Sequence, residues 1–104
     1  MPFGAKLEFF ETELGSPYLA RESWATNLAK DAMEAAYGRP AIEMGVGGSI
    51  PFIAEFGIQF PEAEVLVTGV EDPDARAHSP NESQHLPTFR KVMQTHGLIL
   101  LQAN

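Results

Sequence analysis

The chain has 104 residues, of which 44% are hydrophobic and 20% charged, and this composition excludes a disordered chain, a coiled coil and a collagen-like repeat. It contains no cysteine, which excludes disulfide bridges, thiolate metal ligands and cysteine nucleophiles. The formal net charge is −7 and the seven basic residues are scattered, so neither nucleic acid nor an anionic membrane surface is expected as a partner.

A strand is the first element that the sequence predicts. Within residues 3–14, apolar and polar side chains alternate from Ala5 to Phe9, which is the period of a half-buried strand. In residues 22–37 the apolar side chains recur at the spacing of a helix, and those on the expected buried side are mostly small: Ala25, Leu28, Ala29, Ala32 and Ala36. Gly38 is expected to end this helix, because glycine readily takes the left-handed conformation of a helix C-cap.

A glycine-rich segment follows in the middle of the chain. Residues 41–44 predict a short strand, and the three glycines within 45–48 predict a sharp loop after it. Ser49 is expected as the N-cap of a helix at 50–56, with Pro51 tolerated in the first turn.

The last part of the chain predicts another strand, a long loop and a final helix. Residues 63–68 are typical of a strand buried on both faces, and 69–85 form a polar loop of a length that is usually functional or disordered. The final helix spans 87–102, with one stripe formed by Phe89, Val92, Met93, His96, Ile99, Leu100 and Ala103. Strands that alternate with helices predict an α/β architecture in which helices pack on a sheet.

The sequence contains neither a membrane-spanning pattern nor a targeting signal. Its longest apolar run, Leu98–Leu101, is far shorter than the ~20 residues of a membrane-spanning helix. The opening residues 1–4 have no basic region and no cleavage site. We therefore expect a cytoplasmic protein with no membrane partner.

The glycine-rich loop has two interpretations. If Gly48 and Ser49 lead into a helix N-terminus, their unpaired N–H groups and the serine hydroxyl form a site for a carboxylate or phosphate. Alternatively, the loop is only a tight turn whose serine caps the helix. The Gly-Lys-Ser/Thr ending of a P-loop is absent.

His78, in the long polar loop, is the candidate metal ligand. A neutral imidazole beside acidic residues is a common ligand arrangement, although a lone histidine in a polar loop is also typical of a solvated surface. His85 and His96 do not complete a helical zinc motif, and His96 is interpreted as lying at the edge of the core. The acidic residues at 71–74 either ligate a cation or form a solvated loop, and they lack EF-hand spacing.

In combination, these segments resemble the C-terminal end of the M20 family of metallopeptidases, in particular its carnosinase-like dipeptidase branch. The resemblance rests on GGSIP at 47–51, VTG at 67–69 and AHSPNE at 77–82, in that order. PFGAK at 2–6 and YGR at 37–39 are also similar to the family, so the resemblance covers essentially the whole chain.

The resemblance implies an α/β fold: part of a catalytic domain, with a mixed sheet and packed helices. It implies that residues 1–14 are the strand returning from a lid domain and that 15–104 are the C-terminal part of the catalytic domain. The family hydrolyses dipeptides or N-acyl amino acids with two divalent metal ions, zinc or manganese. By this resemblance His78 is a metal ligand, and Gly48 and Ser49 bind the carboxylate of the substrate.

The same resemblance implies a segment of a longer, homo-oligomeric enzyme. The other metal ligands and the general base of the family have no counterpart here, so no catalytic residue is expected in this segment. The isolated chain is expected to bind no metal stably and to be inactive. The alternative hypothesis is a non-catalytic interaction module with a degenerate site, which self-associates through an exposed sheet edge.

Overall fold

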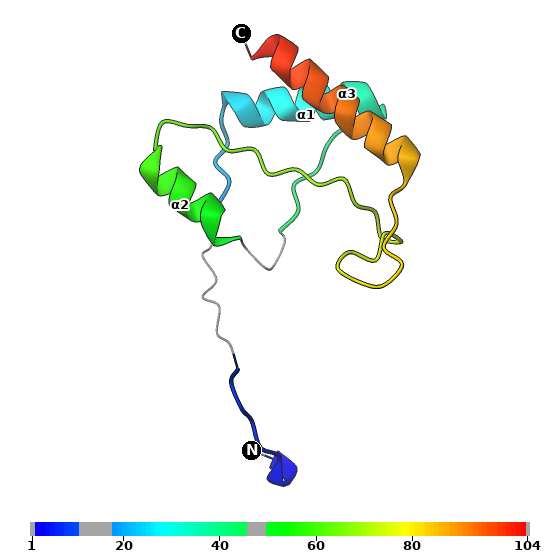
Figure 1. The fold of residues 1–104 in the computed structure, drawn as a ribbon. Coiled ribbons are helices and arrows are strands. Elements are labelled where there is room, and N and C mark those ends of the chain that lie inside the picture. Colours follow the sequence, from blue (N-terminus) through cyan, green and yellow to red (C-terminus); the bar gives the residue numbers. More distant parts are fainter. Residues whose placement is uncertain (1, 11–17, 46–49, 104) are drawn as a thin grey trace.

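The computed structural model describes residues 2–10, 18–45 and 50–103 of the chain. Within these ranges it contains a short 3-10 turn, η1, and three α-helices (Figure 1). Their bounds are Pro2–Gly4 for η1, Trp24–Tyr37 for α1, Pro51–Gln59 for α2 and Leu86–Gln102 for α3. None of the helices in the described part of the chain is long and apolar enough to cross a membrane.

Helix α1 begins and ends at capping residues that the local sequence supplies. The hydroxyl of Ser23 accepts a hydrogen bond of 3.3 Å from the backbone N–H of Thr26, which satisfies one of the unpaired donors of the first turn. At the other end Gly38 takes a left-handed conformation (φ 73°) and its N–H donates to the carbonyl of Glu34 over 2.8 Å. The predicted helix and its glycine stop are confirmed.

Helices α1 and α3 cross and pack together, and among the described helices they form the only contacting pair (Figure 1). The side chains buried on them are small: Ala25, Ala29 and Ala32 on α1 and Thr95 on α3. Thr95 satisfies its hydroxyl by donating to the carbonyl of Lys91 over 2.9 Å, so it can be buried without an unpaired donor. Small side chains permit the two backbones to approach closely.

The side of α3 that is buried differs from the predicted stripe. Thr95 is buried and Lys91 and Leu98 are half-buried, whereas Met93 and Leu100 are exposed by 58% and 73%. The buried side is therefore displaced from the predicted stripe and overlaps it at Val92 and Ile99, which are also half-buried, while the rest of the stripe is exposed.

The expected mixed sheet is not present among the residues that the structure describes, and the α/β prediction is wrong. No strand occurs in residues 2–10, 18–45 or 50–103, and the predicted strands at 41–44 and 63–68 are irregular segments. In one of them the carbonyl of Val65 accepts a hydrogen bond from the hydroxyl of Tyr18 (3.1 Å) instead of from a neighbouring strand. Local alternation predicts an extended backbone, but a strand also needs a partner in register.

The N-terminal segment also departs from its prediction. The described part of residues 1–14 forms η1 followed by an irregular stretch at 5–10, and this part lies away from the helices (Figure 1). The strand expected there is absent from residues 2–10. The division of the chain at residue 14 stays a prediction.

Polar contacts tie the irregular segments to α1. Lys30 on α1 forms an ion pair with Glu43, and the hydrogen bond to this carboxylate raises the pKa of Lys30 above its ordinary value. The hydroxyl of Ser23 donates to Glu64 over 2.7 Å, and Arg21 donates to the carbonyl of Pro61 over 3.3 Å. The segment before α2 is therefore held near the middle of α1, and the segment after α2 is held near its start.

The chain leaves an unusually large surface exposed. Its accessible surface is 9013 Å², against about 5,800 Å² for a folded monomer of 11.4 kDa. Its radius of gyration is 17.8 Å, against about 13 Å for a compact domain of this length. The buried hydrophobic residues of the described part are all alanines: Ala25, Ala29, Ala32 and Ala75. The larger apolar side chains therefore remain wholly or partly in contact with solvent.

Candidate functional site

The polar loop between α2 and α3 is folded back on itself by hydrogen bonds. The N–H of Ser83 donates to the carbonyl of Ala75 over 2.9 Å, and the side chain of Gln84 donates to the carbonyl of Val70 over 2.9 Å. Ala75 is only 1% exposed, so the loop has a small buried centre of its own. The loop predicted from turn-forming residues is confirmed, and hydrogen bonds between its two ends close it.

His78 lies exposed in this closed loop, in an uncommon backbone conformation. Its φ is 59°, and Arg76 and Asn81 nearby have φ of 56° and 62°. Left-handed residues other than glycine cost about 1–2 kcal/mol each, although histidine and asparagine tolerate the region better than most. Strained backbone of this kind is found at functional sites more often than elsewhere. The imidazole is accessible to a ligand or a metal from outside the chain.

The described residues do not provide a metal site by themselves. Within the described ranges there is no group of three or more histidine, aspartate or glutamate side chains that could hold a metal ion. A catalytic zinc takes three protein ligands, so His78 alone does not fit a complete site. The role of His78 as a metal ligand stays a prediction.

The other two histidines have partners elsewhere. A hydrogen bond of 2.8 Å joins Nδ1 of His85 to the hydroxyl of Thr88 in the first turn of α3. Another of 3.1 Å joins Nε2 of His96 to the hydroxyl of Thr68. Whether either histidine takes part in a metal site stays a prediction.

The acidic residues at 71–74 shape the loop. A side-chain oxygen of Asp72 accepts a hydrogen bond of 2.9 Å from the N–H of Asp74, which is the pattern of an Asx turn. One carboxylate oxygen is thus already bonded to the backbone. This favours the interpretation of a solvated loop over that of a cation site.

The predicted carboxylate loop, Gly48 and Ser49, lies outside the described residues. Its boundary with α2 is described, and there the N-cap is Ile50, with Pro51 as the first helical residue and no side-chain cap. The predicted cap, Ser49, lies outside the described residues, so this prediction is not tested. Pro51 fits the first helical position because its missing N–H would be unpaired there. Substrate binding by Gly48 and Ser49 stays a prediction.

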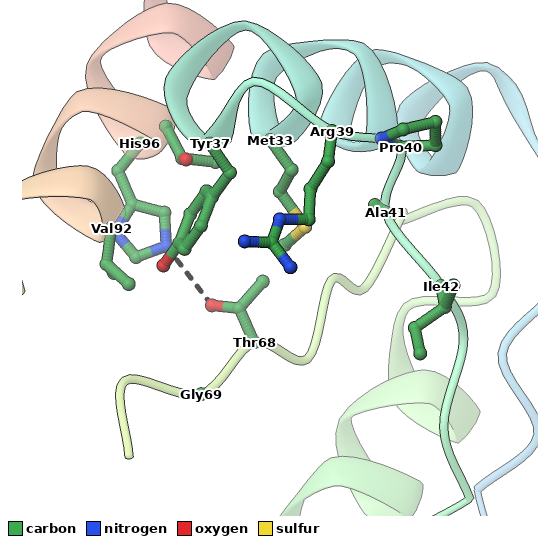
Figure 2. Close-up of a pocket in the computed structure, with 11 residues that line it drawn as sticks. Met33, Tyr37, Arg39, Pro40, Ala41, Ile42, Thr68, Gly69, Val92 and His96 are labelled. Atoms are coloured by element: carbon green, nitrogen blue, oxygen red, sulfur yellow. Dashed lines mark hydrogen bonds between the residues drawn. The ribbon is translucent and has the colours of Figure 1, made fainter. Parts of the chain in front are cut away.

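A cavity of about 250 Å³ lies between α1, α3 and the segments that follow α1 and precede the polar loop (Figure 2). Arg39 points into it toward Tyr37 and Thr68, as Figure 2 shows. The full lining is Met33, Tyr37, Arg39, Pro40, Ala41, Ile42, Thr68, Gly69, Val92, Thr95 and His96. Sequence reasoning missed this cavity because its walls come from separate stretches of chain, and no local motif marks them.

Comparison with known proteins gives one relative. The chain is 34% identical over 84 residues to the cysteinylglycine-S-conjugate dipeptidase of Corynebacterium striatum. The alignment covers 79% of this chain, which spans only 18% of the length of that dipeptidase. No protein-family model matches the chain, and no solved structure matches it.

Proposed function

We propose that the chain is part of a metal-dependent dipeptidase or amidohydrolase and forms the C-terminal part of its catalytic domain, residues 15–104. The observation that carries this proposal is the similarity of most of the chain to a dipeptidase. The large exposed surface supports it as well, since the rest of a catalytic domain would cover apolar side chains that solvent now contacts. The enzyme acts in the cytoplasm on dipeptides or N-acyl amino acids.

His78 is the residue through which this segment serves the reaction. It supplies one imidazole ligand to a centre of two divalent ions, zinc or manganese, whose remaining ligands come from outside the chain. The closed loop supports this role, because its internal hydrogen bonds fold back the stretch of backbone that carries the exposed His78. Gly48 and Ser49 bind the substrate carboxylate, and the segment supplies no general acid or base.

The isolated chain is expected to hydrolyse no dipeptide, even with added zinc or manganese, because one imidazole cannot replace three ligands. The measurement is a dipeptidase assay with cysteinylglycine on the purified chain, repeated after a second purification. Turnover that persists and disappears in a His78→Ala chain would show that the segment contains a whole active site. That result would overturn the proposal.

A second candidate function, a self-associating interaction module, is favoured by the exposed surface. The accessible area exceeds that of a folded monomer of the same mass by about 3,200 Å². A standard interface buries about 800 Å² on each partner, so the excess is several times what a dimer needs. Under this hypothesis the loop around His78 has no catalytic role, and replacing His78 changes no activity.

A further inference from the structure

We infer that the cavity between α1 and α3 is a binding site for a small organic carboxylate with an aromatic or branched apolar body. The described residues that line this cavity have no role in the hydrolase proposed above. The inference therefore stands on the shape and charge of the cavity alone.

The walls of the cavity are mainly apolar. The half-buried side chains of Met33 and Val92 contribute aliphatic surface, and half-buried Tyr37 contributes an aromatic ring, whereas Ile42 at the rim is 89% exposed (Figure 2). An apolar cavity of 150 Å³ accommodates benzene, so about 250 Å³ has room for one ring and a short substituent. Binding sites for small molecules combine such apolar walls with a few polar groups that converge on the ligand.

The polar groups of the cavity favour an anion. Arg39 is solvent-exposed, its side chain extends toward Tyr37 and Thr68 at the mouth of the cavity, and it has no carboxylate partner among the described residues (Figure 2). Nζ of Lys91, which does not line the cavity, lies 5.1 Å from the centre of the Tyr37 ring. A guanidinium binds a carboxylate through paired, charge-assisted hydrogen bonds.

The hydrogen-bonded side chains of His96 and Thr68 are further polar groups in the lining of the cavity. Its hydrogen bond of 3.1 Å joins α3 to the segment before the polar loop, and this bond closes one wall of the cavity (Figure 2). A ligand seated with its ring against Val92 and its carboxylate at Arg39 contacts both walls. Binding is therefore expected to perturb residues of α3 and of the 68–69 segment together.

The test compares 3-phenylpropionate with the neutral 3-phenylpropanol by NMR titration of the full chain. The acid is expected to bind at least about tenfold more tightly than the alcohol, with shifts at Thr68, Val92 and His96. Arg39→Gln is expected to remove this preference and leave the affinity for the alcohol unchanged. The matched control is Arg90→Gln, which removes the same charge from an exposed position outside the cavity lining and should change neither affinity.

A second variant tests the cavity itself. Val92→Phe fills the apolar end and is expected to abolish the binding of both compounds, while the helical circular dichroism signal confirms folding. Equal affinity for acid and alcohol in the original chain would overturn the inference. It would also be overturned if Arg39→Gln retained the preference, or if Arg90→Gln lost it to the same extent.

Discussion

Replacing His78 in the longer protein that contains this segment is expected to lower kcat/KM for dipeptide hydrolysis by at least about 100-fold. Residues that merely orient a metal ligand already contribute about 10- to 100-fold, so loss of the ligand itself should cost more. His78→Asn is the preferred variant, because asparagine also tolerates the left-handed backbone (φ 59°) of this position. The melting temperature of the metal-free protein should stay nearly unchanged, since the side chain is exposed.

The matched control for this experiment is His85→Asn, in the same loop. His85 bonds to Thr88 at the start of α3, where asparagine is also a good N-cap, so this variant should retain both activity and stability. If the His78 variant keeps its activity, the role of His78 as a ligand is refuted. If the metal-free variant also melts many degrees lower, His78 is structural.

The purified chain is expected to self-associate at tens of micromolar, and α2 should contribute to the contact. No residue of α2 is buried, and two of its aromatic rings continue in a row with that of Phe60, the residue after the helix. The centroids of Phe52 and Phe56 are 5.9 Å apart and those of Phe56 and Phe60 are 4.9 Å apart. Full burial of a phenylalanine is worth about 1.5–3 kcal/mol, so Phe52→Gln should weaken association at least about tenfold. Sedimentation velocity over a range of concentrations measures this effect.

Two further comparisons make the association experiment decisive. Phe9→Gln removes an equally large exposed ring from the N-terminal segment, which lies away from the helices, and should have much less effect (Figure 1). Added salt should strengthen association, because it screens the repulsion between chains of net charge −7. A monomer at all these concentrations would contradict the expectation that the exposed apolar surface drives association.

The sequence predicted the helices well because their signals are local. Ser23 and Gly38 cap α1 through groups within one turn, and the apolar spacing that defines α3 also lies within a single segment. The sheet could not be predicted in the same way. The alternation at 63–68 indicates an extended backbone, but strand pairing depends on another segment, and the described chain provides none in register.

The sequence predicted the loop of the candidate site but not the contacts that shape the site. Proline and asparagine mark the loop that contains His78, so its existence could be inferred from composition. The closure of this loop could not be inferred in the same way. It depends on the hydrogen bonds of Ser83 and Gln84, which join residues eight and fourteen positions apart. The cavity at Arg39 depends on how α1 and α3 cross, and the crossing follows from which side of α3 is buried. The stripe of the sequence overlaps the packed side only in part, at Val92 and Ile99, and does not indicate that Thr95 lies at its centre.

The assignment to a metal-dependent dipeptidase is tested most directly by an assay of the longer protein that contains this segment, before and after removal of metal. The protein is expected to hydrolyse dipeptides or N-acyl amino acids, to lose this activity on exhaustive chelation, and to regain it with zinc or manganese. Undiminished activity in the chelated protein would contradict the metal-dependent assignment. Failure to hydrolyse any dipeptide or N-acyl amino acid with either metal would contradict the assignment to this class of hydrolase.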